Sequence, residues 1–404
     1  MKRLDSLLRI LFLAVFVFLT PGARATGDGS RDHGMDSVEI SLLTCSPGNE
    51  VWSLYGHTAI RLRDPARQQD LAVNYGMFSF GQKYFALRFV FGITDYEMGI
   101  QPFPMFLMEY ARNGRGVVQQ TLRLSPGEKA AILQAVYENY LPANRTYRYN
   151  YFYDNCTTRA RDMLVGHLDG RVAYAVDPAV TTSYRDMIHQ WNAGHRWARF
   201  GNDLLLGVRA DAPTDHAQQQ FLPDSLRHDF ARATVIDAAG RRHPLVDSTV
   251  VLLQPNAANA PLAGFGLWDS LTPRLLFAAL FVLAALVTLY ELRRGKAFWL
   301  VDVVLFTLDG LAGLVLLAMV FSQHPTVSFN LQILLLNPIA LALVYPLAAR
   351  TLRGRFHRGW DVLSACLLLF LAGGFFQDYA EGAVFLALCL LCRTTSKRFI
   401  YKQQ

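Results

Sequence analysis

The pattern of apolar and polar residues changes abruptly near residue 270. Before that point, apolar residues occur in short alternating or helically spaced runs separated by turn residues, as in a mixed α+β domain. After it, apolar segments follow at about residues 274–290, 298–321, 329–348, 361–376 and 382–392. A helix needs about 20 apolar residues to cross a bilayer, so the last two are short for a span. The pattern predicts an exported domain over residues 26–270 and a transmembrane domain of about five helices over 271–404.

The loops between these apolar segments differ in charge. The loops after the second and fourth segments, residues 322–325 and 377–381, contain no Lys or Arg. Because basic loops stay on the cytoplasmic side, we expect a cytoplasmic C-terminus and an exported domain on the other side of the membrane. The basic residues follow the first, third and fifth segments: Arg293, Arg294, Lys296, Arg350, Arg353, Arg355, Arg358, Arg393, Lys397, Arg398 and Lys402.

The first 25 residues fit an export signal. Lys2 and Arg3 precede an apolar run over residues 7–19, and residues 23–25 read Ala-Arg-Ala, like a signal-peptidase site. A signal peptide over residues 1–25 would export the domain that follows it, in agreement with the loop charges. A retained N-terminal anchor remains the alternative.

Charge and cysteine content narrow the function further. Much of the net charge of +7 comes from the loops predicted to be cytoplasmic, so it does not indicate nucleic-acid binding. Only Cys45 and Cys156 of the five cysteines lie in the exported domain, too few for a disulfide framework. A single disulfide between them is the alternative to two free thiols. No C-x-x-C or H-E-x-x-H motif occurs in that domain, so we expect neither zinc nor another cofactor.

A cysteine and a histidine indicate the chemistry. The aromatic run 151–153 precedes a helix start in which Asp154 or Asn155 caps the N-terminus and Cys156 occupies the first turn. Helix dipoles favour a thiolate at that position, which makes Cys156 the candidate nucleophile. His57, the candidate base, opens a predicted strand in which apolar and charged residues alternate. A thiol on a helix N-terminus facing an imidazole on a strand is the papain-like arrangement, here with the histidine first.

A third residue is needed to orient the imidazole. Asn74 lies on the next predicted strand and is the candidate, with Tyr75 and Asp95 in reserve. An ordinary residue at the end of a strand is the alternative for Asn74.

Several motifs resemble a known family. They are SLLTCSPG at residues 41–48, YGHTAIR at 55–61, NYG at 74–76, YRYNYFYDNCTTR at 147–159, FGNDLLLG at 200–207 and FLP at 221–223. On these segments the chain resembles the Lnb-type membrane proteins of bacteria. The resemblance implies an α+β fold: a circularly permuted papain-like (NlpC-like) domain followed by a transmembrane helical bundle. It also implies lipoprotein N-acylation, in which a fatty acyl chain moves to the α-amino group of a lipid-modified N-terminal cysteine.

Four residues near these motifs are candidates for substrate binding. We expect Asn155 to help the Cys156 amide stabilise an oxyanion. Arg61 and Arg159 would meet lipid phosphates or a carboxylate, although solvated side chains are the alternative. Tyr75, beside Asn74, completes the set.

Aromatic residues are unusually dense from Met77 to Leu107. This density predicts either a lipid-facing surface that lets acyl chains reach the thiol, or a protein core. The sequence leaves both interpretations open.

These observations predict a membrane-anchored thiol acyltransferase. It would transfer a fatty acyl chain from a diacylglyceryl lipoprotein to the α-amino group of its N-terminal cysteine through an acyl-thioester on Cys156. Its partners would be the membrane and a diacylated lipoprotein or phospholipid. The alternatives are an NlpC-like cysteine peptidase or amidase acting on cell-wall peptides, and a receptor without enzymatic activity.

Overall fold

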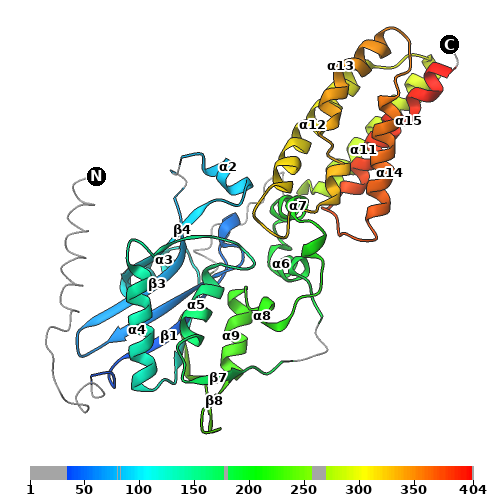
Figure 1. The fold of residues 1–404 in the computed structure, drawn as a ribbon. Helices are drawn as coiled ribbons and strands as arrows, with labels where there is room; N and C mark the ends of the chain where they lie inside the picture. The colour runs from blue at the N-terminus through cyan, green and yellow to red at the C-terminus, as the bar shows by residue number, and fades with distance from the viewer. Residues whose placement is uncertain (1–33, 80, 82, 177–180, 257–269, 403–404) are drawn as a thin grey trace.

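A computed structural model describes residues 34–79, 81, 83–176, 181–256 and 270–402. The predicted signal peptide, residues 1–25, lies outside the described residues and stays a prediction. The described chain has an N-terminal region rich in β-strands and a C-terminal region of apolar helices, so the architecture is α+β (Figure 1).

A seven-stranded antiparallel sheet forms the centre of the N-terminal region, in the order β10-β5-β1-β2-β3-β4-β6. The strands are β1 (Glu39–Cys45), β2 (His57–Asp64), β3 (Gln69–Met77), β4 (Asp95–Pro102), β5 (Val117–Leu122), β6 (Thr146–Arg148) and β10 (Val246–Leu253). The predicted strand that opens at His57 is confirmed as β2, which lies in the middle of the sheet.

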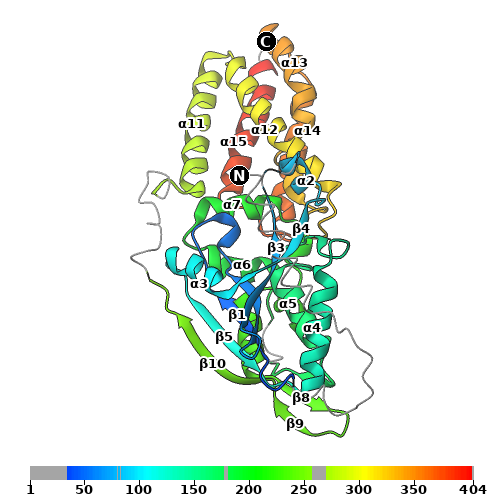
Figure 2. The same ribbon diagram turned by 90° about the vertical axis from the view of Figure 1, so that its left-hand side faces the viewer.

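Helices cover both faces of this sheet (Figure 2). On one face, Ile60 and Leu62 of β2 belong to the core formed with α4 (Pro126–Tyr140), α5 (Cys156–Val165) and α9 (Pro223–Arg232). On the other face, Ala59 packs in a smaller core under α3 (Phe103–Arg112). Alternate residues of β2 therefore bury apolar surface on both sides, which fixes the register of the strand.

Local signals in the sequence place two further elements correctly. α4 begins with a capping box, because the Glu128 amide donates to Ser125 Oγ at 3.2 Å and the Ser125 amide donates to the Glu128 carboxylate at 2.8 Å. The hairpin predicted around residues 238–240 is formed by β8 (Thr234–Asp237) and β9 (Arg242–Pro244), with Gly240 at φ +77° in its turn. β7 (Gly170–Ala173) pairs with β8 and completes a second, three-stranded sheet.

Short helices connect the sheet domain to the membrane helices. They are α6 (Tyr184–Asn192), α7 (Arg196–Leu205), α8 (His216–Gln219) and the 3-10 turn η2 (Val208–Ala210). Buried Asp203 of α7 binds Arg185 at 3.0 Å and His189 at 2.8 Å. Gln332 of the membrane region donates to the Asp203 carbonyl at 2.8 Å, so hydrogen bonds tie the two regions together.

The C-terminal region is a helical bundle. It contains α11 (Pro273–Arg294), α12 (Trp299–Val320), the turn η3 (Leu331–Leu334), α13 (Ile339–Leu352), α14 (Gly359–Gly373) and α15 (Ala383–Lys402). Among the described residues, α11, α12 and the segment 331–352 are long and apolar enough to cross a membrane, and α14 is a shorter apolar helix.

One expectation about the bundle is wrong in detail. The predicted fifth segment ended at residue 392, with Arg393 and Lys397 in a cytoplasmic loop. The helix instead continues to Lys402, and both side chains are fully buried against Glu291 and Asp302. Ion pairing allows the basic residues to continue an otherwise apolar helix, which hydropathy alone does not show.

Candidate active site

The proposed nucleophile occupies the first position of α5, as the sequence predicts. Asn155 is the N-cap, and its Oδ1 accepts from the amides of Thr157 at 2.8 Å and Thr158 at 3.0 Å. The Thr158 hydroxyl in turn accepts from the Asn155 amide at 2.9 Å. This reciprocal cap fixes the start of the helix, and the half-buried Cys156 lies at the positive end of its dipole.

The proposed base lies at the start of β2. His57 follows Gly56, whose φ of +82° and closeness to the Cys45 carbonyl leave no room for a side chain. The His57 Nε2 atom lies 3.0 Å from Asn74 Oδ1 on the neighbouring strand β3. An amide oxygen only accepts hydrogen bonds, so Nε2 carries the hydrogen and Nδ1 is left as the basic nitrogen.

Cys156 and His57 lie close enough for each to shift the pKa of the other. Burial by itself raises the pKa of the thiol, but the charge of His57 and hydrogen bonds from His57 and the Thr58 backbone outweigh it. The net pKa of Cys156 is therefore lowered. Burial likewise disfavours the imidazolium, yet the Cys156 charge and hydrogen bonds to Cys156 and Asn74 raise the pKa of His57. Both shifts favour a thiolate–imidazolium pair.

Two threonines that the sequence analysis did not single out hold this pair together. Thr58 Oγ1 lies 3.0 Å from Thr157 Oγ1, and both side chains are fully buried. This contact joins β2 to α5 at the residues that follow the base and the nucleophile. The only signal in the sequence is that a threonine follows each of them, which was too weak to use.

The predicted substrate-binding arginines are both engaged within the protein. Arg61 pairs with Asp70 at 2.7 and 2.6 Å and lies 3.6 Å from the centre of the Phe103 ring, on the α3 face of the sheet. Arg159 pairs with Asp154 at 2.6 and 2.7 Å. Their contact with a substrate stays a prediction.

Asn155 and Tyr75 have structural partners as well. The Asn155 Nδ2 donates to the carbonyls of Tyr151 and Phe221, both at 2.9 Å, so its two amide hydrogens are occupied. Tyr75 is buried, and its hydroxyl donates to Asn139 Oδ1 at 3.0 Å. Of the two residues held in reserve for orienting His57, Tyr75 is thus in the core, and Asp95 pairs with Arg88 and Arg148.

The cysteines are free thiols, so the alternative of a disulfide between Cys45 and Cys156 is wrong. Cys45 is fully buried, and burial raises the pKa of its thiol to about 12, which makes it unreactive. Within residues 34–79, 83–176, 181–256 and 270–402, no cluster of His, Cys, Asp and Glu has the composition of a metal site.

The segment that precedes Cys156 contacts the membrane region. Tyr151 precedes the cap, and its hydroxyl lies 3.3 Å from Thr326 Oγ1 in the loop after α12. Its ring packs 4.8 Å from that of buried His324, whose pKa burial lowers to about 4. His324 therefore faces the sheet domain as a neutral ring.

Comparison with known proteins decides the family. The model of the Lnb N-terminal periplasmic domain matches residues 30–190, and that of the Lnb transmembrane domain matches residues 267–404. The chain belongs to the Lnb-type family. No curated protein and no solved structure matches it.

The match to the Lnb periplasmic domain contains His57, Asn74 and Cys156, whereas residues 191–266 belong to neither match. Those residues include α7, α9 and β10. Asn202 of α7 donates to the Tyr55 hydroxyl at 2.6 Å, two residues before His57. The unmatched segment thus contacts the residues just before β2, which begins with His57.

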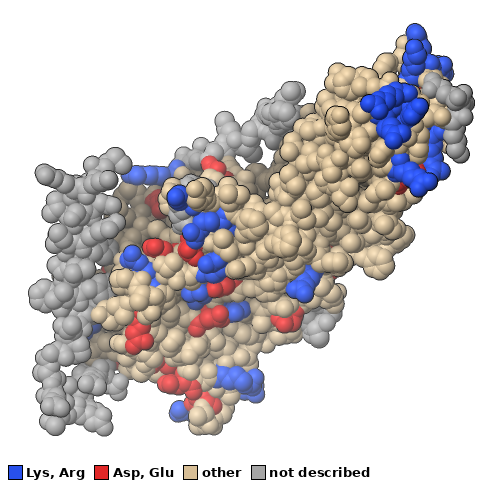
Figure 3. Space-filling view, turned by 45° about the horizontal axis from the view of Figure 1, so that its top comes forward, with Lys and Arg blue, Asp and Glu red and all other residues tan. Residues whose placement is uncertain are grey.

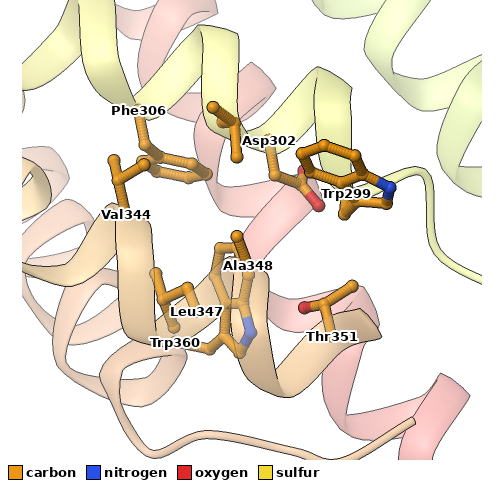
Figure 4. Close-up of a pocket in the computed structure, with 9 residues that line it drawn as sticks. Trp299, Asp302, Phe306, Val344, Leu347, Ala348, Thr351 and Trp360 are labelled. Carbon is orange, nitrogen blue, oxygen red and sulfur yellow. The ribbon is translucent and has the colours of Figure 1, made fainter. Parts of the chain in front are cut away.

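The Lnb transmembrane domain has a cavity of its own, shown in Figure 4. It is small and lies between α12, α13 and α14, where Trp299, Phe306, Leu347 and Trp360 line it. Asp302 at its edge is bound by Arg393 and Lys397 of α15. These groups hold helices together within the bundle and do not contact Cys156 or His57.

Proposed function

We propose that this Lnb-type protein is a membrane-anchored thiol acyltransferase of lipoprotein N-acylation. Family membership relates the chain to that process. The observation that carries the proposal is the set of Cys156, His57 and Asn74 with a lowered thiol pKa, together with the contact of nearby Tyr151 with Thr326 of the membrane region. A site at the edge of a bilayer suits a donor and an acceptor that are both held in it.

The first half-reaction forms an acyl-thioester. His57 Nδ1 takes the Cys156 proton, and Sγ attacks the ester carbonyl carbon of the diacylglyceryl lipoprotein. A C–S bond forms, the C–O bond breaks, and the glyceryl oxygen leaves with the proton from His57. The Cys156 amide, at the N-terminus of α5, is the expected donor to the oxyanion.

The second half-reaction resolves the thioester. The α-amine of the lipoprotein's N-terminal cysteine attacks the thioester carbonyl, and His57 takes a proton from the nitrogen. The C–S bond breaks, the amide forms, and the proton returns to Cys156. No cofactor is needed, because the acyl group is already activated as an ester.

The arrangement also supports a permuted papain-like domain on the periplasmic side of the inner membrane. A helix-borne thiol and a strand-borne imidazole with an asparagine partner are the papain-like set, with the histidine first in the chain. Figure 3 shows basic residues gathered at the end of the bundle away from the sheet domain, beyond an uncharged flank. Arg274 at the start of α11 is the exception, because it pairs with Glu381, which also binds Arg196 of α7. That distribution supports a cytoplasmic C-terminus, with domains at residues 26–270 and 271–404.

Mass spectrometry of a lipoprotein's N-terminal peptide tests the proposal. Cells carrying the unaltered protein or the control Cys366→Ala, a thiol in α14, should acylate the α-amine, and cells carrying Cys156→Ala should not. Unchanged acylation with Cys156→Ala would show that the proposed substrate or nucleophile is wrong. The cell-wall peptides would then be compared, as the peptidase alternative requires.

A further inference from the structure

The segment between β3 and β4 reaches from the sheet to the membrane region. It contains α2 (Phe85–Val90), a helix in which no residue is buried. The Gln323 amide, in the loop after α12, donates to the Phe91 carbonyl at 3.0 Å. Gly92 packs so closely on His324 that an added Cβ would lie 3.0 Å from the His324 amide nitrogen. α2 is therefore fixed beside the end of α12, as Figure 1 shows.

The outer surface of this segment is apolar. Tyr84 is 66% exposed, Leu87 58% and Phe89 40%. Phe321, the C-cap of α12 and two residues before Gln323, is 71% exposed as well. Large apolar side chains in water are unfavourable, whereas the interface of a bilayer accommodates aromatic and apolar groups.

Charge at α2 also suits a lipid surface. Lys83 is exposed and lies 5.1 Å from the centre of the Tyr84 ring. A lysine next to an aromatic residue is the combination that favours the boundary between lipid phosphates and acyl chains. Arg88, the other basic residue of this segment, forms an ion pair with Asp95 and so has a structural role.

A row of aromatic rings runs from α2 toward the thiol. The successive ring pairs and their centroid distances are Phe89–Phe85 at 6.3 Å, Phe85–Phe78 at 5.8 Å, Phe78–Tyr96 at 5.0 Å and Tyr96–Tyr149 at 4.3 Å. Tyr149 is next to the nucleophile: a Cβ added to Gly76 would lie 3.4 Å from its ring and 3.8 Å from the Cys156 Cβ. The row thus joins the membrane edge to the reacting sulfur.

We infer that α2 and this aromatic row bind the fatty acyl chain of a membrane lipid and lead its ester carbonyl to Cys156. The ligand is a long acyl chain, since a row of aromatic side chains favours methylene groups. Asn74 lies on β3, and Phe78 of the row directly follows the end of that strand, so the row and the residue that orients His57 belong to one continuous segment. The part of the inference that concerns the reaction at Cys156 rests on the proposed function, whereas the part that concerns lipid binding does not.

Photocrosslinking tests the binding by itself. The full-length protein is placed in phosphatidylcholine vesicles containing a phospholipid with a diazirine within its acyl chain, and the labelled peptides are identified by mass spectrometry. We expect labelling over residues 83–91, reduced about tenfold in the double variant Leu87→Gln/Phe89→Gln. Labelling of α11 is the internal control, and Val250→Gln, on the exposed edge strand β10, is the matched control variant.

Absence of label on residues 83–91, with α11 labelled, would overturn the inference whatever the enzyme does. Protein–protein crosslinks between two α2 peptides would overturn it too, because α2 would then bind a second copy of the chain. Equal labelling of the double variant and the unaltered protein would show that these side chains do not bind the acyl chain.

Chain-length dependence tests the link to catalysis. Acylation of Cys156 is compared for a palmitoyl and an acetyl ester with the same leaving group. Leu87→Gln/Phe89→Gln should slow the palmitoyl ester about tenfold and leave the acetyl ester nearly unchanged. Equal losses for both esters would overturn the inference in favour of a general structural defect. If neither ester acylates the unaltered protein, the proposed function fails, and the crosslinking result still decides the lipid site.

Discussion

The proposed catalytic pair of the sheet domain and the charged cluster of the membrane bundle both join ionisable side chains, but they do so in different ways. Cys156 and His57 are half-buried, and each has few partners. In the bundle, the side chains of Arg393, Lys397 and Glu291 are fully buried. Because Cys156 and His57 are partly exposed and only Asn74 orients the imidazole, a proton can move between them. The side chains in the bundle are fully enclosed among opposite charges, which favours a fixed scaffold.

In the bundle cluster, each of the two basic side chains pairs with both acidic side chains. Arg393 binds Glu291 at 2.7 Å and Asp302 at 2.8 Å, and Lys397 binds the same two acids at 3.2 and 2.7 Å. The Thr288 hydroxyl accepts from Arg393 at 3.0 Å. Because the charges cancel and most of their hydrogen bonds are made, α11, α12 and α15 are joined without a net charge inside the bundle.

The largest effect on stability is expected from opening this cluster. Arg393→Ala leaves Glu291 and Asp302 with only Lys397 and should lower the free energy of unfolding by about 3–5 kcal/mol, measured by thermal or chemical unfolding in detergent. Arg398→Ala, which removes an exposed pair with Asp361, is the matched control and should change little. Equal effects of the two variants would contradict the scaffold role.

The largest effect on chemistry is expected from removing the base. His57→Ala should slow acylation of Cys156 about 10²–10⁴-fold while leaving the unfolding temperature nearly unchanged. The two variants then differ clearly, because His57→Ala lowers reactivity and Arg393→Ala lowers stability. Wild-type acylation rates in His57→Ala would show that the thiol needs no base.

The pH dependence of Cys156 alkylation tests whether His57 lowers the pKa of the thiol. The pKa of Cys156 is lowered and that of His57 is raised, so the ion pair exists between these two values. Iodoacetamide should therefore react with Cys156 at a pH below the usual range of a cysteine, with the rate rising as pH increases through the lowered pKa. In His57→Ala only burial and the weaker hydrogen bonds remain, so the rise should move to higher pH. An unmoved profile would disprove the coupling.

A smaller effect is expected from the helix cap. Asn155→Ala removes the bonds to Thr157 and Thr158 and should cost about 1–2 kcal/mol of stability, with slower alkylation of Cys156. Ser125→Ala removes the corresponding cap of α4 and should cost a similar amount without altering Cys156. If both variants leave alkylation unchanged, the cap of α5 does not position the nucleophile.

Local signals were sufficient for much of the site. A histidine at a strand start and a cysteine after a capping residue are recognised from neighbours in the sequence, and in the structure each side chain shifts the pKa of the other. Asn74 was predicted as the orienting residue, and its amide oxygen lies at hydrogen-bond distance from His57. Asn74 lies on β3, which follows β2 after a short turn, so it can only lie on a strand next to the one that begins with His57.

The partners of the charged residues could not be predicted. Arg61 was expected to meet a substrate, yet Asp70 and Gln119 hold it. Arg393 and Lys397 were placed in a loop because their segment of sequence shows only that charges follow an apolar run. The acids that bind them are about a hundred residues away in the chain.

The sequence by itself thus determined the order of the elements, the apolar helices and the two caps, and it predicted Cys156 and His57 as nucleophile and base. These depend on periodicity and on residues within a few positions of each other. Only the tertiary structure decided that α2 meets the end of α12, that Thr58 meets Thr157, and that aromatic rings connect the membrane edge with Cys156. Such contacts join segments far apart in the chain, and packing selects them through shape and burial, which local patterns do not record.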